Sequence, residues 1–266
     1  AVLGANGRTG ALVVEALLRA GARPRALTRS GRWTPPSESG TGSAAAGVAT
    51  QGVEVGKADV SDAASLAAAL AGASAVVFAA AFSRGSSLPQ DVDNRGLVAT
   101  ARAARDLGVG RLVVVSSAAV TRPYAPVGVL LNTVGSGVLL EKLKGESEMR
   151  GLLRGSGCTY TVVRPGGLKK GEAAGFDKLE FNQGDTLVGS VPRADVAEVC
   201  VEAALDPSNR GAGKTFEMYE AKTRNGLLPW YGASKYAVAG RRDCGEMLGA
   251  LLDDEAVTDV PGFLPF

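Results

Sequence analysis

The stretch that decides the fold is Ala1-Val2-Leu3-Gly4-Ala5-Asn6-Gly7-Arg8-Thr9-Gly10. Its glycines form a G-x-x-G-x-x-G run directly after a short apolar segment. The next residues, from Ala11 to Ala20, carry apolar side chains at helical spacing, so the pattern predicts a strand, a tight turn and a helix. Glycine lets the backbone approach a pyrophosphate, and the N-terminus of the following helix attracts its negative charge. A glycine-rich turn without a ligand is the alternative, but this context favours a dinucleotide-binding site.

The charges after the second expected strand indicate which dinucleotide binds. NAD-binding sites of this kind place an Asp or Glu about 20 residues after the glycines, where it binds the ribose 2′-hydroxyl. This chain has no acid between Glu15 and Glu38, and it carries arginines instead: Arg25, Arg29 and Arg32, with Arg8 in the glycine turn. A guanidinium can bind a 2′-phosphate through two hydrogen bonds. We therefore predict NADP(H) in preference to NAD(H), with Arg29 as the first ligand and Arg8 as the second; a solvated basic edge is the alternative.

Strand and helix patterns alternate downstream of this unit. The expected strands are Arg23–Thr28, Val53–Val60, Ser74–Ala81 and Arg111–Val115, and helices are expected from Ser61 or Asp62 to Leu70 and from Asp93 to Leu107. This spacing predicts an α/β fold with a doubly wound parallel sheet of the Rossmann type. We expect residues 1–221 to form a single NAD(P)-binding domain and residues 222–266 to form a small C-terminal extension. Residues 30–52 are rich in Gly, Ser, Pro and Ala, and they predict a long loop beside the 2′-phosphate.

Composition excludes several classes of function. The 266 residues carry 29 basic and 27 acidic side chains, so the net charge predicts no nucleic-acid partner. The absence of histidine excludes Ser-His-Asp and Cys-His catalysis and histidine-ligated metals, and we expect no metal site. Three widely spaced cysteines, Cys158, Cys200 and Cys244, suggest a reducing compartment. No apolar run has the length of a membrane span. The first residue already lies in an expected strand, so we expect that upstream residues, including any targeting segment, are missing from this sequence.

Several motifs occur in the order seen in a known group of proteins. They are the glycine run, Asp59-Val60, Ser116-Ser117, Tyr160-Thr161-Val162-Val163-Arg164-Pro165-Gly166-Gly167-Leu168, Asp185-Thr186-Leu187 and Val191-Pro192-Arg193-Ala194-Asp195-Val196-Ala197. With these motifs the chain, to about residue 218, resembles atypical short-chain dehydrogenases. It is most similar to the NAD(P)-binding, NmrA-like branch that includes plant and algal chloroplast proteins related to Tic62. The resemblance implies a chloroplast location, in the stroma or at the thylakoid.

The resemblance also implies roles for individual residues. It places Asp59 and Val60 near the adenine and the three alanines from Ala79 to Ala81 along the adenosine ribose. It places Ser116 and Ser117 beside the nicotinamide ribose and the segment from Pro165 to Leu168 against the nicotinamide. With the glycine turn, the arginines and a lysine discussed next, the expected cofactor-binding residues are Gly4, Asn6, Gly7, Arg8, Thr9, Gly10, Arg29, Asp59, Val60, Ala79, Ala80, Ala81, Ser116, Ser117, Lys142, Pro165, Gly166, Gly167 and Leu168.

The chain departs from the wider family at the proton donor. Active short-chain dehydrogenases carry Tyr-x-x-x-Lys after the serine-bearing strand, where the Lys lowers the Tyr pKa and the Tyr exchanges a proton with the substrate oxygen. In the corresponding helix Lys142 can stand for this lysine, with Lys144 as a substitute, but Val138 occupies the tyrosine position. Lys142 and Ser116 are therefore the catalytic candidates. A second match, Tyr231-Gly232-Ala233-Ser234-Lys235, lies in the C-terminal extension. We interpret it as a surface helix or loop, with catalysis as the alternative.

Two functions of different classes remain open. The first is an NADPH-dependent oxidoreductase with weak activity on a small apolar molecule, in which water or the substrate supplies the proton. The second is a non-catalytic structural or redox-regulatory subunit that holds NADP(H) in a larger chloroplast complex. The intact glycine turn favours the first function, and the lost tyrosine favours the second. The expected partner is thus a small-molecule substrate or a protein complex, and peripheral association with a membrane stays open.

Overall fold

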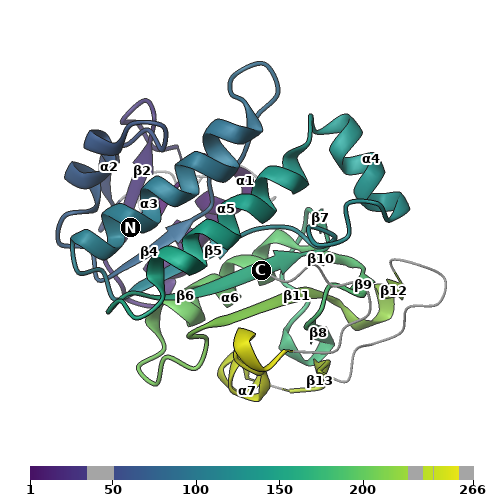
Figure 1. Ribbon diagram of the computed structural model, residues 1–266. Coiled ribbons are helices and arrows are strands. Elements are labelled where there is room, and N and C mark those ends of the chain that lie inside the picture. The colour runs from purple at the N-terminus through teal and green to yellow at the C-terminus, as the bar shows by residue number, and fades with distance from the viewer. Residues whose placement is uncertain (35–50, 227–235, 242, 258–266) are drawn as a thin grey trace.

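The computed structural model describes residues 1–34, 51–226, 236–241 and 243–257, and its centre is a nine-stranded sheet (Figure 1). In spatial order the strands are β13 (Val238–Ala239), β8 (Leu179–Asn182), β11 (Lys214–Glu220), β6 (Thr159–Pro165), β5 (Arg111–Val115), β4 (Ala75–Phe78), β1 (Val2–Leu3), β2 (Arg25–Thr28) and β3 (Glu54–Lys57). The strands from β11 to β3 pair in parallel, whereas β8 is antiparallel to both of its neighbours. The predicted doubly wound parallel sheet is confirmed, with an antiparallel edge added to it.

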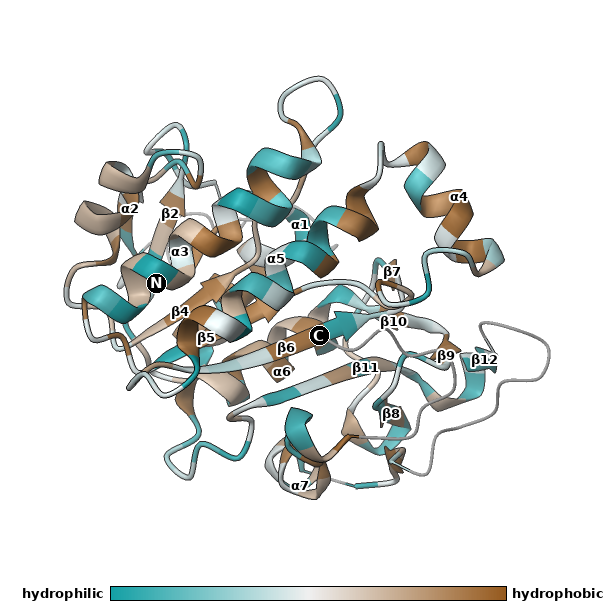
Figure 2. Cartoon of the chain, viewed as in Figure 1, coloured by the Kyte–Doolittle hydropathy of each residue, from teal (hydrophilic) through white to brown (hydrophobic). Residues whose placement is uncertain are grey.

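Helices cover both faces of this sheet. One face packs against α1 (Arg8–Arg19) and α6 (Arg193–Leu205), and α7 (Cys244–Ala250) lies against α6. The other face packs against α2 (Ala63–Leu70), α3 (Leu97–Asp106) and α5 (Val138–Leu153). Successive side chains of a strand point to opposite faces, so Val113 joins the first core and Leu112 and Val114 join the second. Figure 2 shows these apolar residues concentrated in the central strands β4 and β5.

Short elements surround the carboxyl ends of the strands. These are α4 (Pro126–Val134), the parallel pair β7 (Gly167–Lys169) and β10 (Ser190–Pro192), and the antiparallel pair β9 (Leu187–Val188) and β12 (Asn225–Gly226). The π-helix η2 (Gln90–Gly96) precedes α3, and three single turns are η3 (Phe176–Lys178), η4 (Ala221–Thr223) and η5 (Asp254–Ala256). Within the described residues, no helix has the length and apolar character that a bilayer crossing requires.

Several boundaries differ from those expected. The first helix begins at Arg8, not at Ala11, because the glycine turn already ends at Gly7, which caps the helix. The segment expected to be one helix to Leu107 is instead the π-helix η2 followed by α3. The cap of α2 is Asp62, whose carboxylate accepts hydrogen bonds from two backbone N–H groups of the first turn. Most of the long loop expected at residues 30–52 lies outside the described residues.

The described part of the C-terminal extension packs into the same core as the parallel strands. β13 extends the main sheet by pairing with β8, and Met247 and Leu248 of α7 belong to the core beneath α6. The strand β13 and the helix α7 therefore share one hydrophobic core with the parallel sheet, through Val238, Met247 and Leu248.

A network of buried charged side chains connects α5, β6 and η5. Glu146 of α5 lies between two guanidinium groups: Arg164 Nη2 is 2.7 Å from Glu146 Oε2, and Arg150 Nη2 is 3.0 Å from the same oxygen. Arg150 Nε in turn lies 3.1 Å from Asp254 Oδ2 of η5. All four side chains are buried. Buried charges of this kind require their partners, because an isolated charge in the interior is strongly destabilising.

Candidate functional site

A pocket of about 580 Å³ lies at the carboxyl ends of β1, β2, β3 and β4. In doubly wound sheets this is the edge where nucleotides bind. The pocket brings together nine of the residues expected to bind a cofactor: Gly4, Asn6, Gly7, Arg29, Asp59, Val60, Ala79, Ala80 and Ala81. Seven further polar residues line it that the sequence did not assign to a cofactor: Thr28, Ser30, Ser61, Ser83, Ser86, Ser87 and Asp91. The adenosine half of the expected site is thus one continuous surface.

The glycine turn leaves room for backbone and ligand at the floor of this pocket. Gly4 has a positive φ of +79°, and a Cβ added to it would lie 2.7 Å from the backbone nitrogen of Ala80. A Cβ at Gly10 would strike the carbonyl of Gly4, whose carbon would be 2.9 Å away. Any larger side chain at either position would push the turn away from β4 or from α1. This cradle, followed directly by the N-terminus of α1, fits the pyrophosphate of a dinucleotide.

The segment after β2 is tied to the glycine turn. Asn6 Nδ2 donates to the carbonyl of Arg32 at 2.8 Å, and Asn6 Oδ1 accepts from the backbone N–H of Thr34 at 3.0 Å. The buried Trp33 indole donates to the carbonyl of Ala5 at 3.1 Å. These contacts hold the chain that follows Arg29 against the turn. Nothing in the sequence pattern separated Trp33 from an ordinary core aromatic residue.

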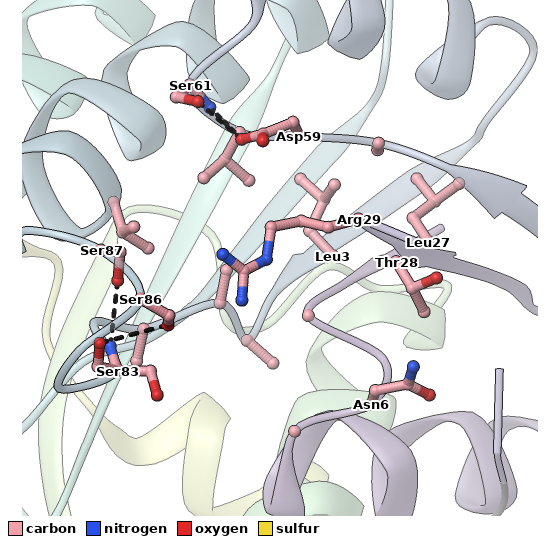
Figure 3. A pocket seen from close by; sticks show the side chains of 18 of the residues that line it. Leu3, Asn6, Leu27, Thr28, Arg29, Asp59, Ser61, Ser83, Ser86 and Ser87 are labelled. Carbon is pink, nitrogen blue, oxygen red and sulfur yellow. Dashed lines mark hydrogen bonds between the residues drawn. The ribbon is translucent and has the colours of Figure 1, made fainter. Parts of the chain in front are cut away.

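Arg29 supplies a positive charge to the pocket. Figure 3 shows its side chain extending from the end of β2 into the pocket, on the side that Asp59 and Ser61 also line. Hydrogen bonds from the hydroxyl and the backbone N–H of Ser61, at 2.7 and 3.0 Å, hold the pKa of Asp59 below its usual value, and the charge of Arg29 adds to this effect. Arg8 begins α1 and is exposed, and it does not belong to the residues that line the pocket.

A serine-rich loop forms the opposite rim. Residues 83–87, here called the serine loop, read Ser-Arg-Gly-Ser-Ser and contribute three hydroxyl groups to the lining. Ser87 Oγ accepts from the backbone N–H of Ser83 at 3.1 Å, and Arg84 donates to the carbonyl of Val134 at the end of α4. The loop therefore connects the pocket to α4. Its serine-rich composition was the only signal in the sequence that it could bind a polar ligand. The sequence alone did not show that this loop lies across the pocket from Arg29.

The two serines after β5 have different surroundings. Ser116 is buried, and its hydroxyl donates to Glu146 Oε1 in the charged network of the interior. Ser117 is half-buried, and its hydroxyl donates to the carbonyl of Ala118 at 3.0 Å. The hydroxyl hydrogen of Ser116 is thus engaged away from the pocket. Ser117 is the more accessible of the two serines, and it is therefore the better candidate for contact with a nicotinamide ribose.

The structure separates the two candidate lysines. Lys142 is largely buried, and its ammonium lies 2.7 Å from Oδ1 of Asp93, whereas Lys144 is exposed and pairs with Glu141. Lys142 is therefore the inward-facing lysine of α5. Val138 lies one turn before it and packs in a small apolar cluster with Ala119, so the tyrosine position holds an aliphatic side chain in this fold as well.

The remaining expected residues lie behind the glycine turn or at the end of β6. Thr9 and Gly10 are buried in the first turn of α1. Gly166 and Gly167 connect β6 to β7, where their N–H groups donate to the carbonyls of Met218 and Gly189 at 3.0 and 2.7 Å. Pro165 is buried, and Leu168 is 38% exposed. The second Tyr-x-x-x-Lys match, Tyr231 to Lys235, lies outside the described residues.

A family model described as NAD(P)H-binding matches residues 4–207. The chain belongs to this NAD(P)H-binding family. The match spans the glycine turn, the pocket and α6, so the family and the cofactor class both agree with the site described above.

Three plant relatives of this NAD(P)H-binding protein extend the comparison. The uncharacterized chloroplastic protein At2g34460 of Arabidopsis thaliana is 36% identical over 214 residues, which are 77% of this chain and 71% of that protein. Sanguinarine reductase of Eschscholzia californica is 36% identical over 120 residues, 43% of this chain and 41% of that protein. The chloroplastic protein TIC 62 of Pisum sativum is 28% identical over 219 residues, 77% of this chain and 40% of that protein. The predicted relationship to Tic62 is thereby confirmed.

A solved structure has the same fold. The putative NAD-dependent epimerase/dehydratase from Bacillus halodurans superposes with a TM-score of 0.63 and 25% sequence identity, covering 84% of this chain and 94% of that one. The Rossmann-type architecture of the NAD(P)H-binding family is therefore shared.

Proposed function

We propose that this protein binds NADP(H), with Arg29 as the ligand of the 2′-phosphate. The observation that carries the proposal is the place of Arg29: it lines the pocket at the carboxyl end of β2, where NAD-binding sites of this fold carry an acid. A guanidinium attracts a phosphate dianion there, and a carboxylate would repel it. The adjacent Ser30 lines the same pocket.

The residues around the proposed nicotinamide site support a weak reductase activity. A bound reduced nicotinamide supplies a hydride. Ser117 and Lys142 would hold its ribose, and Val138 has no proton to give. The hydroxyl of Ser116 donates to Glu146. Neither Val138 nor Ser116 therefore provides a proton donor to a substrate carbonyl. We therefore propose reduction of a small apolar molecule, with the proton taken from water or from the substrate itself.

The second candidate function is cofactor storage without turnover. The aliphatic contacts of Val138 favour it, because this position is built into an apolar cluster and offers no general acid. In this role bound NADP(H) would stabilise the fold or report redox state to a larger complex. We propose a chloroplast location, in the stroma or at the thylakoid surface, because the plant relatives At2g34460 and TIC 62 are chloroplastic proteins by name.

The affinity for the phosphorylated dinucleotide tests the first proposal. Titration calorimetry should show that NADPH binds more tightly than NADH, and that Arg29→Ala weakens NADPH binding roughly tenfold to a hundredfold while leaving NADH binding almost unchanged. Arg23→Ala is the matched control, since it removes the same charge near the other end of the same strand. Equal affinities for NADPH and NADH in the unaltered protein would overturn the assignment of NADP(H).

Turnover separates the two candidate functions. Oxidation of NADPH would be followed with a panel of small apolar carbonyl, quinone and imine compounds, under conditions where calorimetry shows the cofactor site filled. Turnover that Arg29→Ala reduces at limiting NADPH supports the reductase. Saturated binding without oxidation of any compound supports the storage role.

A further inference from the structure

The ion pair between Asp93 and Lys142 lies beneath the rim of the pocket. The Asp93 side chain is 0% exposed and that of Lys142 is 12% exposed, and Nζ and Oδ1 are 2.7 Å apart. The other carboxylate oxygen, Oδ2, accepts a hydrogen bond from the backbone N–H of Phe82 at 2.9 Å. Asp93 therefore contacts both the segment that leads into the serine loop and the lysine of α5.

Two local features of the chain bring this pair together. The π-helix η2 has a wider turn than an α-helix, and such turns often occur at functional sites. Gly145 lets α5 approach η2 closely, because a Cβ there would lie 2.5 Å from the carbonyl oxygen of Asp93 and 3.0 Å from Cα of Asn94. A second contact between the same elements, from Asn94 Nδ2 to Glu141 Oε2 at 2.8 Å, fixes the register.

The charge of Lys142 is balanced by Asp93 inside the protein. Among the described residues, Oδ1 of Asp93 is buried and accepts no hydrogen bond, so the nearby ammonium is what compensates its charge. Of the neighbouring charges, Arg95 pairs with Asp91 on the exposed side of η2, and the exposed Lys144 pairs with Glu141, whose side chain is 15% exposed. Exposed pairs are screened by solvent, whereas the buried pair acts on its surroundings through a low dielectric.

In short-chain dehydrogenases with an intact Tyr-x-x-x-Lys, the lysine charge serves to lower the pKa of the tyrosine. This chain has Val138 at that position, so an unbalanced ammonium would have no phenol to act on. Its field would fall instead on the nicotinamide, which carries a positive charge when oxidised and none when reduced. An uncompensated lysine beside it would therefore disfavour the oxidised form.

We infer that Asp93 is a positioning residue which neutralises Lys142 and so sets the relative affinity of the site for oxidised and reduced NADP(H). The inference rests on the proposed function, in which Lys142 holds the nicotinamide ribose. With the pair intact, the site carries no net charge next to the nicotinamide and accepts both redox forms. Asp93 does this without touching the cofactor, by fixing the charge and the place of Lys142.

The test measures the dissociation constants of NADP⁺ and NADPH by calorimetry, and the quantity of interest is their ratio. Asp93→Asn keeps an acceptor for Phe82 but leaves the lysine charge unbalanced, so the ratio of the NADP⁺ constant to the NADPH constant should rise by about threefold to tenfold. Lys142→Met leaves the carboxylate unbalanced, so the ratio should fall. The double variant should return to a ratio near that of the unaltered protein.

Opposite shifts distinguish this role from a structural one. Damage to the fold would weaken both redox forms together and in the same direction in both variants. Glu148→Gln, on the same helix, removes an exposed charge and is expected to leave the ratio unchanged. Equal ratios in Asp93→Asn, Lys142→Met and the unaltered protein would overturn the inference while NADP(H) binding stands. If the unaltered protein binds neither form, the proposed function fails and this inference fails with it.

Discussion

The carboxylate of Asp254 lies 3.1 Å from Nε of Arg150, so the last turn described in the chain is joined to the last turn of α5. The same carboxylate accepts hydrogen bonds from the hydroxyl of Tyr160 at 3.0 Å and from the N–H and hydroxyl of Thr215, each at 2.7 Å. One side chain thus satisfies donors from α5, β6 and β11. Asp254 therefore adds a polar anchor to the apolar contacts by which the C-terminal segment joins the folded core.

Removal of this carboxylate should destabilise the protein strongly. Asp254→Ala leaves the Arg150 guanidinium buried with one partner fewer, so we expect the free energy of unfolding to fall by about 3 kcal/mol or more. Urea unfolding followed by circular dichroism measures it. Asp253→Ala is the control, because this neighbouring side chain is exposed and its loss should cost less than about 0.5 kcal/mol. Similar losses in both variants would contradict the role given to Asp254.

The glycine turn should be intolerant of a single methyl group. Gly10→Ala places a Cβ against the carbonyl of Gly4, and the turn has to shift to make room. We expect NADPH affinity to fall by about tenfold or more, because the backbone can no longer approach the pyrophosphate. Gly151→Ala on α5 meets nothing within 4 Å and should leave the affinity unchanged. Wild-type affinity in Gly10→Ala would show that the pyrophosphate binds elsewhere.

The hydrogen bond of Trp33 to the glycine turn should contribute to stability. Trp33→Phe keeps most of the apolar contact but leaves the buried carbonyl of Ala5 without this donor. We expect a loss of roughly 1 to 3 kcal/mol in the free energy of unfolding, measured by urea titration. Binding of NADPH should raise the free energy of unfolding of the variant, as it does for the unaltered protein, because a ligand that binds only the folded state stabilises it. A neutral substitution would mean that solvent satisfies the carbonyl equally well.

Stability should decline on the alkaline side because of Glu217. Burial, and then the nearby charge of Asp185, raise the pKa of Glu217 from its ordinary value of 4.5 to about 8. The folded protein binds this proton more tightly than the unfolded chain does, so the contribution to stability is complete below about pH 4.5 and is lost as the pH rises through about 8. Glu217→Gln should remove this decline in the unfolding free energy, and Glu148→Gln, at an exposed position, should keep it.

The contribution of Glu146 to stability depends on pH in the opposite direction to that of Glu217. The two guanidinium groups of Arg164 and Arg150 outweigh its burial and lower its pKa to about 2. Its contribution to stability is therefore present above about pH 4.5 and is lost as the pH falls towards 2.

The alkaline decline assigned to Glu217 would be contradicted if the free energy of unfolding of the unaltered protein were constant from about pH 4.5 to about pH 8.

The sequence predicted the parallel sheet, the glycine turn and the arginine at the end of β2, because each depends on a local pattern. A glycine run, an apolar strand and a helical repeat carry their information within about a dozen residues. The same holds for Asp62, whose hydrogen bonds reach the first turn of its own helix. Of the nine expected residues that line the pocket, Gly4, Asn6, Gly7 and Arg29 follow from such local motifs. The other five, Asp59, Val60 and the three alanines from Ala79 to Ala81, were implied only by the resemblance to short-chain dehydrogenases.

The contacts that the sequence did not predict join segments far apart in the chain. Trp33 reaches Ala5, Arg84 reaches Val134 and Asp254 reaches Arg150. No periodicity marks such pairs, since an exposed arginine and a buried one look alike in the sequence. The π-helix was also missed, because its residues fit an α-helical pattern equally well and the wider turn depends on packing against α5.

The pocket draws all of its described lining from residues 3 to 92, whereas the carboxylate that completes the buried charge network belongs to residue 254. During synthesis, the whole adenosine-binding surface therefore leaves the ribosome long before Arg150 acquires its last partner. A nascent chain of this protein possesses its nucleotide-facing residues while its interior is still incomplete. Early capture of a dinucleotide would then favour the native pairing of the first four strands ahead of the rest of the sheet.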